Sequence, residues 1–308
     1  MKSIEFFDME SPMEIRNLIT FMTVAELNGF TKAAEALGYT QSTVSFQIKQ
    51  LEAELGCLLF ERINHNVTLT AKGLELQNYA RKIISLTEEV KQNITSPGEI
   101  SGHIHAVTPD SVCEVMLTKD FEAFHKKYPK ISLKFSTADT DDMFKILDRN
   151  EADVILTLDS HVYQQDYIIA KEEPVNMLFV TTSSSPFANR KNVKIEEIIN
   201  EPFILTEKAM GYRNSFDDAL AKKSLQINPI LEIARTDLIA NALEKGIGIS
   251  FLPEFVVESR IRKGTLASID VCDFHVDIWR QLIYHKNKWL SNHLKAFLEF
   301  VMENEFHS

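Results

Sequence analysis

The stretch from Phe30 to Glu61 constrains this chain most, because it shows two short helical patterns joined by a tight turn and followed by a turn into a strand. We expect the first helix to begin near Thr31, and Gly38 permits a turn of about three or four residues. Thr40 is the predicted N-cap of the second helix. Apolar residues recur in that helix at spacings of four, three and four, which predicts a buried face made of Val44, Ile48, Leu51 and Leu55.

Short hydroxyl, amide and basic side chains lie on the opposite face of the second helix. Such groups can bond base edges and phosphate oxygens, and a capped helix N-terminus presents free N–H groups to an anion. The pattern therefore predicts a winged helix-turn-helix that binds duplex DNA, against the alternative of two ordinary packed helices. The candidate DNA contacts are Thr31, Lys32, Thr40, Gln41, Ser42, Thr43, Ser45, Phe46, Lys49, Arg62 and Lys72.

This region resembles the DNA-binding domain of LysR-type transcriptional regulators. Two positions depart from the family pattern: Phe46 stands where Arg is common, and His65-Asn66 occupy the wing tip, where a second basic residue is usual. We expect Phe46 to alter base preference through a thymine methyl or a deoxyribose, and the wing to contact phosphate or the minor groove less strongly. The resemblance rests on Phe30, Ala33, Ala34, Leu37, Gln41, Ser42, Val44, Ser45, Ile48, Leu51, Glu52, Leu55, Gly56, Leu59, Phe60, Arg62, Leu69, Thr70 and Gly73.

The charge balance excludes a non-specific DNA coater, which would carry a basic excess. Up to Pro97 the chain has nine Lys and Arg against twelve Asp and Glu, and the remainder has twenty-four against thirty-two. DNA affinity is therefore expected to depend on a few placed cations, on helix ends and on two binding sites per dimer.

A long amphipathic helix is predicted from about Ala71 to Asn93, with no Pro and with no Gly after Gly73. Roughly 20 residues at about 1.5 Å each make a rod of about 30 Å. The resemblance implies that this helix pairs two winged helices, although packing on its own domain is the alternative. Thr95 to Gly98 break the helix and form the predicted hinge. The predicted dimerisation residues, at coiled-coil spacing, are Leu76, Tyr79, Ile83, Leu86 and Val90.

From Gly102 onward, apolar strand patterns alternate with helical segments, which predicts an α/β architecture with mainly parallel sheets. About 200 residues of this pattern suit two lobes better than one small sheet. The predicted strands are His103 to Val107, Ile131 to Phe135, Val154 to Leu158, Asn176 to Val180, Phe203 to Leu205, Ile230 to Ile233, Ile247 to Phe251 and Ile278 to Tyr284.

This half resembles the effector-binding domain of the same family, which has the two-lobed fold of periplasmic solute-binding proteins. The motifs are Phe121 to Phe124 with Tyr128-Pro129, Glu151 to Val154, and Gly246 to Ile249 with Leu252-Pro253. The predicted domains are an extension that we expect to be disordered (1–12), the mainly α winged helix-turn-helix (13–70), the linker helix and hinge (71–98) and the effector-binding domain (99–308). Lobe I is expected over about 99–170 and 268–308, and lobe II over about 171–267.

Ligands of such folds bind between the lobes, at strand C-termini and helix N-termini. Polar residues that follow the predicted strands are therefore candidate effector contacts, against the alternative that each is a helix cap or a surface turn. Hydroxyls and helix N-termini favour a small anion or a polar metabolite, and we expect Arg213 to pair with a carboxylate and Thr236 to cap a helix. The candidates are Thr108, Pro109, Asp110, Ser111, Asp139, Thr140, Thr206, Gly211, Tyr212, Arg213 and Thr236.

Other classes of function lack their sequence signatures. No GxSxG, P-loop, GxGxxG or HExxH motif is present, so we expect no enzyme, no catalytic residue and no cofactor other than a small-molecule effector. A transport receptor would need a signal peptide. Cys57, Cys113 and Cys272 form no CxxC, and His103 and His105 have no ligand partners, so no metal site is expected. An oxidant sensor using Cys113 or Cys272, and a repressor that works without effector, stay open.

The sequence contains no apolar run of about 18 residues, and its start, MKSIEFFDMESP, lacks a signal-peptide core. We therefore expect a cytoplasmic protein without a membrane partner. The resemblance implies three partners, namely double-stranded promoter DNA, a small effector and further copies of the chain as a dimer or tetramer, with RNA polymerase as a fourth.

Overall fold

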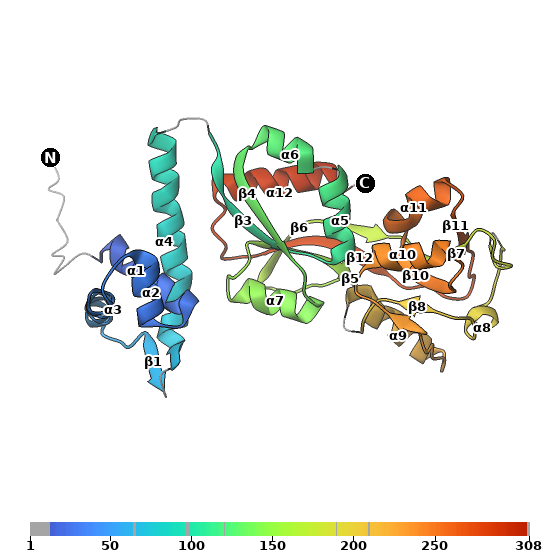
Figure 1. Cartoon of the computed structure of the whole chain (residues 1–308), viewed down its shortest axis with the longest axis horizontal. Coiled ribbons are helices and arrows are strands. Elements are labelled where there is room, and N and C mark those ends of the chain that lie inside the picture. Colours follow the sequence, from blue (N-terminus) through green and yellow to red (C-terminus); the bar gives the residue numbers. More distant parts are fainter. Residues whose placement is uncertain are drawn as a thin grey trace. The chain divides into compact units, whose positions relative to one another are not determined.

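The computed structural model describes residues 13–63, 66–95, 99–119, 121–188, 190–208 and 210–306. It separates into two compact units, Met1–Glu99 and Ile100–Ser308 (Figure 1). The predicted extension over residues 1–12, His65 at the predicted wing tip and residues 96–98 of the predicted hinge lie outside the described residues.

The first unit is a three-helix head with a two-stranded wing, followed by a long helix. The strands pair antiparallel, with Phe60 opposite Leu69. The elements are α1 (Ile15–Leu27), α2 (Phe30–Leu37), α3 (Gln41–Leu55), β1 (Phe60–Ile63), β2 (Asn66–Leu69) and α4 (Ala71–Thr95).

Local sequence explains how the head folds. Gly38 ends α2 in the left-handed region at φ 68°, which a side chain would resist, and Thr40 caps α3 by accepting the backbone N–H of Thr43 at 3.2 Å. The buried face of α3 joins a core that also contains Phe21, Phe30 and Phe60. The apolar stripe is shorter than predicted, because Val44, Ile48 and Leu51 are fully buried whereas Leu55, at the end of the helix, is 38% exposed.

Lobe I of the second unit has a five-stranded sheet in the order β4-β3-β5-β12-β6. Helix α7 packs on one face through Met143 and Leu147, and α12 packs on the other face through Phe297. The strands are β3 (Ser101–Val107), β4 (Lys130–Ser136), β5 (Val154–Asp159), β6 (Tyr167–Val175) and β12 (Ile278–His285). The helices are α5 (Asp110–Lys119), α6 (Phe121–Lys127), α7 (Thr140–Asp148) and α12 (Asn292–Asn304).

Lobe II has a three-stranded sheet in the order β10-β7-β11, and a bridge from Phe203 to Ile249 adds the small β8-β9 pair to its edge. The strands are β7 (Met177–Thr182), β8 (Ile204–Leu205), β9 (Leu231–Glu232), β10 (Ile249–Pro253) and β11 (Leu266–Ile269). The helices are α8 (Ile195–Ile198), α9 (Gly211–Lys222), α10 (Thr236–Glu244) and α11 (Glu254–Arg262).

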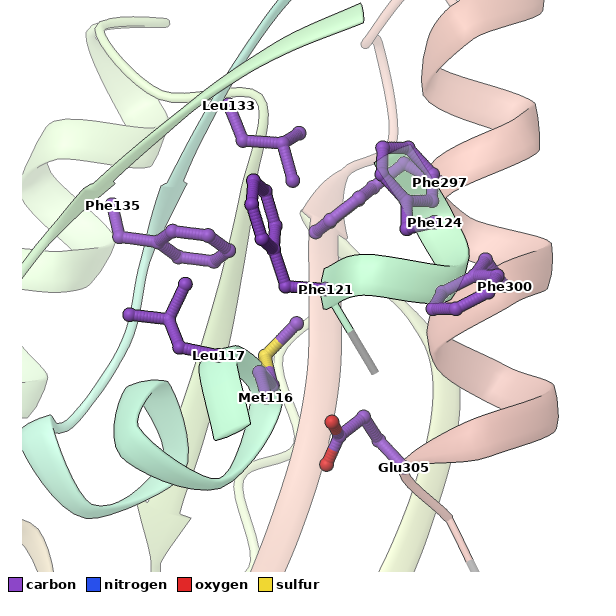
Figure 2. A pocket seen from close by; sticks show the side chains of 9 residues that line it. All are labelled: Met116, Leu117, Phe121, Phe124, Leu133, Phe135, Phe297, Phe300 and Glu305. Carbon is purple, nitrogen blue, oxygen red and sulfur yellow. The ribbon is translucent and has the colours of Figure 1, made fainter. Parts of the chain in front are cut away.

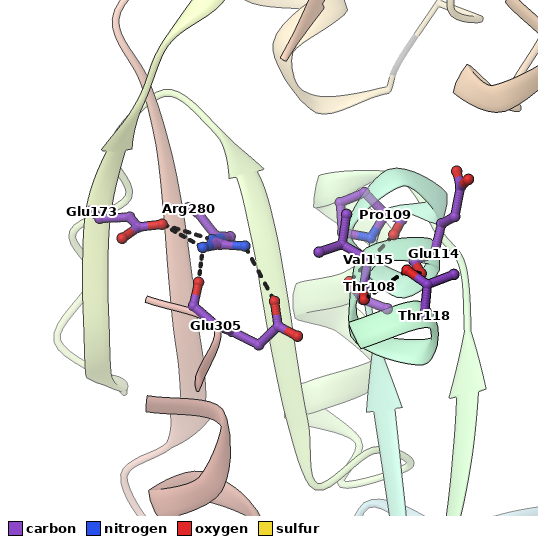
Figure 3. A network of polar contacts seen from close by, with 8 residues as sticks. All are labelled: Thr108, Pro109, Glu114, Val115, Thr118, Glu173, Arg280 and Glu305. Carbon is purple, nitrogen blue, oxygen red and sulfur yellow. Dashed lines mark hydrogen bonds and ion pairs between the residues drawn. The ribbon is translucent and has the colours of Figure 1, made fainter. Parts of the chain in front are cut away.

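An ion-pair network holds the end of lobe I together (Figure 3). Arg280 of β12 donates to the Glu173 carboxylate of β6 and to the Glu305 carbonyl that follows α12, and its guanidinium lies 3.5 Å from the Glu305 carboxylate. The rings of Phe255 and Phe306 lie within 5.6 and 4.9 Å of that guanidinium. Because the two carboxylates and the rings surround Arg280, its burial leaves no uncompensated charge.

Two predictions about the sheets were wrong. The sheets are mixed, since β12 runs antiparallel to β5 and β6, and β7 runs antiparallel to β10 and β11. The strands also change sheet at Asn176 and after Ile269, a few residues beyond the predicted lobe boundaries at 170/171 and 267/268. The reason is that β6 and β11 were not predicted.

Candidate DNA-reading surface and interlobe pocket

The exposed face of α3 carries the predicted base-reading side chains. Gln41, Ser42 and Lys49 are exposed, Phe46 is 67% exposed, and Thr43 and Ser45 are half-buried. A buried hydrogen bond of 2.7 Å from Thr20 of α1 to Gln47 fixes the helix against the head. The Thr40 hydroxyl also lies 2.8 Å from the hydroxyls of both Ser42 and Thr43, so the three side chains order the helix N-terminus.

The basic residues predicted to contact DNA around α3 differ in their exposure and in whether they pair with a carboxylate. Lys32 is exposed on α2, as is its predicted neighbour Thr31. Lys72 forms a 2.8 Å ion pair with Glu75. This hydrogen bond raises the pKa of Lys72, so the lysine stays protonated, and the Glu75 carboxylate offsets part of its positive charge. Arg62 belongs to β1, but its side chain lies outside the described residues.

Helix α4 exposes most of the predicted dimerisation residues, which form an apolar stripe termed the seam. Tyr79, Ile83, Leu86 and Val90 are between 38% and 57% exposed and recur every three or four residues along one face of the helix. Leu76 differs from the prediction, because it packs against the core of its own head. The seam available to a partner therefore begins at Tyr79, one turn later than expected.

Polar residues from both lobes meet in one pocket of the second unit. Eight of the eleven predicted effector contacts line it, together with Ala138, Met143, Leu158, Met210 and Ala234, which were not predicted. Its cavity volume of about 20 Å³ gives room for roughly one water-sized group in this conformation. The predicted residues in the lining are Pro109, Asp110, Ser111, Thr140, Thr206, Gly211, Tyr212 and Thr236.

The N-termini of four helices contribute residues to the lining of this pocket. The lining includes the first residue of α5, α7, α9 and α10, namely Asp110, Thr140, Gly211 and Thr236. Thr236 was predicted as a cap, but Arg235 occupies the N-cap position and Thr236 is the first helical residue. Each helix N-terminus carries a partial positive charge and unpaired N–H groups, so their convergence favours an anion.

Three buried hydroxyls in the pocket lining add donor capacity. Within the described part of the chain, Thr206 Oγ1, Tyr212 Oη and Thr236 Oγ1 make no hydrogen bond. Burial raises the pKa of Tyr212 well above its usual value, although the nearby Thr206 hydroxyl opposes the shift, so the phenol stays protonated. Buried unsatisfied hydroxyls are unusual in proteins, and these three belong to residues that line the pocket.

Three predicted effector contacts do not line the pocket. Arg213 is 2% exposed and lies on another side of α9, where it donates to Asp217 at 3.0 Å, forms an ion pair with Glu232 at 3.5 Å and donates to the Thr206 carbonyl. Thr108 is fully buried, and Asp139 caps α7 by accepting the Asp142 N–H at 2.8 Å. The prediction that Arg213 pairs with an effector carboxylate was therefore wrong, because its guanidinium is committed to protein carboxylates.

The sequence reasoning missed Asp159, which joins the lobes beside the pocket. Its carboxylate accepts from Thr140 Oγ1 at 2.7 Å and from Ser215 Oγ of α9 at 3.3 Å. A Cβ on Gly211 would lie 2.2 Å from the Leu158 carbonyl oxygen, so glycine permits this close approach of α9 to β5. Asp159 directly follows a predicted strand. The rule that ligands bind at strand C-termini, which selected the other candidates, could therefore have found it.

Acidic groups surround one side of the pocket at the contact between α5 and α10. Burial raises the pKa of Asp110, and nearby Arg235 partly opposes the shift. Burial also raises the pKa of Glu114, with Asp237 and Asp110 adding to the shift. Arg235 is itself bound to Asp237 by hydrogen bonds of 2.7 and 3.0 Å. In the described part of the chain, no Lys or Arg lines the pocket, so an anion there would depend on the helix N-termini for positive charge.

A second pocket lies within lobe I and has a different character (Figure 2). Eight of its lining side chains are apolar or aromatic, and Glu305, which pairs with Arg280, stands at its edge. The eight converge from α5, α6, β4 and α12, and they are Met116, Leu117, Phe121, Phe124, Leu133, Phe135, Phe297 and Phe300. This pocket offers no donors to a polar anion.

The remaining candidates have structural partners or lie apart. His103 lies 2.9 Å from Ser132 Oγ, and the His105 ring lies 2.7 Å from both the Glu151 carbonyl and Ser136 Oγ. Burial raises the pKa of Cys113, and all three cysteines are free thiols. Among the residues that the structure describes, no cluster of His, Cys, Asp and Glu could hold a metal ion, and no helix is long and apolar enough to cross a membrane.

A winged-helix head and a two-lobed ligand-binding domain define a ligand-responsive DNA-binding regulator. The chain matches the bacterial regulatory helix-turn-helix protein model of the lysR family over residues 15–74, and the LysR substrate binding domain over residues 97–305. It belongs to the LysR family of DNA-binding transcriptional regulators. Its relatives include the uncharacterised regulators YwqM and YusT of Bacillus subtilis, 32% and 30% identical over 94% and 93% of this chain and 98% and 95% of theirs.

Full-length solved structures share the fold. A full-length OxyR variant from Pseudomonas aeruginosa superposes with a TM-score of 0.67 at 18% identity, covering 95% of both chains. Full-length CbnR in complex with its target DNA gives a TM-score of 0.57 at 20% identity, covering 94% of this chain and 99% of that one.

Proposed function

We propose that this regulator reads its operator with the exposed face of α3, as a dimer held by the α4 seam. The candidate base contacts Gln41 and Ser42 lie at the start of α3, where its N-terminal N–H groups can also meet a phosphate. Two heads give two half-sites, which compensates for the scarcity of basic residues in the head. Exposed apolar side chains at coiled-coil spacing support the pairing, because isolated exposure of so many would be costly in water.

The effector is, in this proposal, a small anion or polar metabolite bound in the interlobe pocket. One observation carries this: the lining of one cavity includes the first residues of four helices and three residues whose buried hydroxyls have no partner among the described residues. An anion there would gain hydrogen bonds from groups that lack partners among the described residues. The cavity has room for only a water-sized group, so any larger ligand must move the lobes apart, and that movement is the proposed signal.

A thermal-shift screen with Thr236→Val as the discriminating variant tests the pocket. Phosphate, sulfate and small mono- and dicarboxylates are the probes, because the helix ends favour anions. A ligand at about 100 times its Kd should stabilise the protein by about 2.7 kcal/mol, and the valine variant should lose that gain because it lacks the hydroxyl. Valine at position 236 should not destabilise the free protein, since the hydroxyl has no partner within the described residues.

Thr157→Val is the matched control for this screen. Thr157 also has a buried hydroxyl without a partner in the described residues, but it does not line the pocket. The control should respond to the anion like wild type. An equal response of wild type, Thr236→Val and Thr157→Val would move the anion site elsewhere.

The protein acts in this proposal by binding and not by catalysis, in the cytoplasm where its DNA lies, with RNA polymerase as a further partner. The effector would bind the two lobe arrangements with affinities that differ by about 1–3 kcal/mol, the usual range of allosteric coupling. Effector binding should therefore change operator affinity by roughly 5- to 150-fold.

Oxidant sensing through cysteine is the second candidate. Burial holds the pKa of Cys113 above its usual value, which reduces the thiolate that peroxide attacks, whereas Cys272 is exposed. The Cys113→Ser, Cys272→Ser double variant should keep the wild-type transcriptional response to peroxide. A response that disappears in the double variant would favour this second candidate.

A further inference from the structure

Phe46 is the exception among the phenylalanines of the described head. Phe21, Phe30 and Phe60 are 0%, 7% and 5% exposed, and their rings pack together with centroids 5.3 and 5.8 Å apart. Phe46 is 67% exposed and, within the described part of the chain, makes no ring contact. Burying a phenylalanine side chain gains free energy, so an exposed ring on a helix surface leaves that gain for a partner.

The helix spacing defines what lies beside this ring. Ser42 is four residues before Phe46 and Lys49 three residues after it, so the three side chains share one stripe of α3, opposite the buried Val44, Ile48 and Leu51. Ser42 and Lys49 are both exposed. If Lys49 binds a phosphate of the DNA backbone, the Phe46 ring, which lies between Ser42 and Lys49 on this stripe, would lie against the bases.

A phenyl ring can neither donate nor accept a conventional hydrogen bond. The hydrogen-bonding edges of all four bases therefore give it nothing, and the apolar group on the floor of the major groove is the C5-methyl of thymine. We propose that Phe46 is a specificity-determining residue that recognises a thymine C5-methyl in each half-site. This inference rests on the proposed role of α3 as the reading helix.

The test removes the methyl group alone. The full-length protein is first used to select duplexes from a random pool, and each thymine of the selected site is then replaced by deoxyuridine. One thymine per half-site should be sensitive. Losing a contact worth about 0.8 kcal/mol weakens binding about fourfold, so replacing the thymine in both half-sites of a dimer should weaken it about 15-fold.

Phe46→Ala and Lys49→Ala separate base reading from general affinity. Phe46→Ala should weaken binding to the thymine duplex by a similar factor, and it should bind the thymine and deoxyuridine duplexes equally. Lys49→Ala should weaken binding to both duplexes alike and keep the thymine preference, because a phosphate contact carries no sequence information. Neither side chain belongs to the head core, so both variants should unfold at the wild-type temperature.

Two results would overturn the inference. If Phe46→Ala still prefers thymine over deoxyuridine as strongly as wild type, another residue reads the methyl. If wild type binds every deoxyuridine duplex as well as the parent, the ring contacts a sugar or nothing. Failure of the proposed function looks different, because wild type would then select no duplex from the pool.

Discussion

At the scale of single residues, Arg213 shows how adjacent side chains take different roles. Tyr212 and Arg213 are consecutive on α9, so their side chains point about 100° apart, one into the pocket and one away from it. The sequence places both after a strand and at a helix N-terminus, but it does not say which face of α9 meets the cavity. Tyr212 therefore lines the pocket and stays a predicted effector contact, whereas Arg213 does not line it.

Replacing Arg213 by Ala should destabilise the second unit. The buried guanidinium joins Asp217, Glu232 and the Thr206 carbonyl. Breaking a fully buried pair costs about 3–5 kcal/mol, and the cost here should be smaller because both carboxylates still reach water. Urea unfolding followed by tryptophan fluorescence measures this, because Trp279 and Trp289 both lie in that unit. The exposed Lys208→Ala control should stay within about 0.5 kcal/mol of wild type. Unchanged stability of Arg213→Ala, together with a lost anion response, would restore Arg213 as a ligand contact.

Glu114→Gln should stabilise the protein at neutral pH. Partial desolvation and the nearby Asp237 and Asp110 raise the pKa of the exposed Glu114 in the folded state, so the folded protein binds this proton more tightly than the unfolded chain does. Raising the pH through that pKa therefore costs wild type stability that the glutamine variant keeps. The advantage should vanish below about pH 4, where the carboxyl is protonated in both states. Glu299→Gln, at an exposed position, is the control, and an advantage that persists at about pH 3 would contradict the account.

At the scale of elements, α4 makes the most direct prediction. An Ile83→Glu, Leu86→Glu variant should place charges in the proposed seam and convert dimers held by α4 to monomers, because buried unpaired carboxylates are costly. Sedimentation velocity gives the oligomeric state. Asn78→Glu adds the same kind of charge at an exposed position outside the proposed seam and should leave the state unchanged. A variant that keeps the wild-type sedimentation would place the dimer contact elsewhere.

Elements also differ in how well periodicity predicts them. Helix α3 has a strong cap and an apolar stripe, so its start at Gln41 could be read from the sequence. Strand β6 carries Lys171, Glu172, Glu173 and Pro174, which do not read as a strand, and it forms because it is the outer strand of the sheet, where one side needs no partner. Register with β12, including Trp279 opposite Pro174, is set by tertiary pairing that no local pattern contains.

At the scale of the whole molecule, the chain consists of two compact units, a DNA-binding head and a two-lobed domain. The rule that ligands bind at strand C-termini brought eight candidate residues to one pocket from both lobes. It worked because β3, β4 and β5 run parallel in lobe I and β8 and β9 run parallel in lobe II, so their carboxyl ends meet at one edge of each sheet. Asp159 was not predicted although the same rule could have selected it, and its link to Ser215 depends on how the lobes pack. The chain carries both LysR-family domains, and we propose that an effector acts by changing the coupling between them.

The most direct measurement is a titration of the purified full-length protein into fluorescently labelled DNA from upstream of its own gene, beside a scrambled duplex of equal length. We expect binding to the upstream DNA to be tighter by at least about 1000-fold, with a preference that persists as salt is raised, because base contacts and dimer geometry supply that preference. Equal affinity for both duplexes at every salt concentration, with or without a stabilising anion, would contradict it.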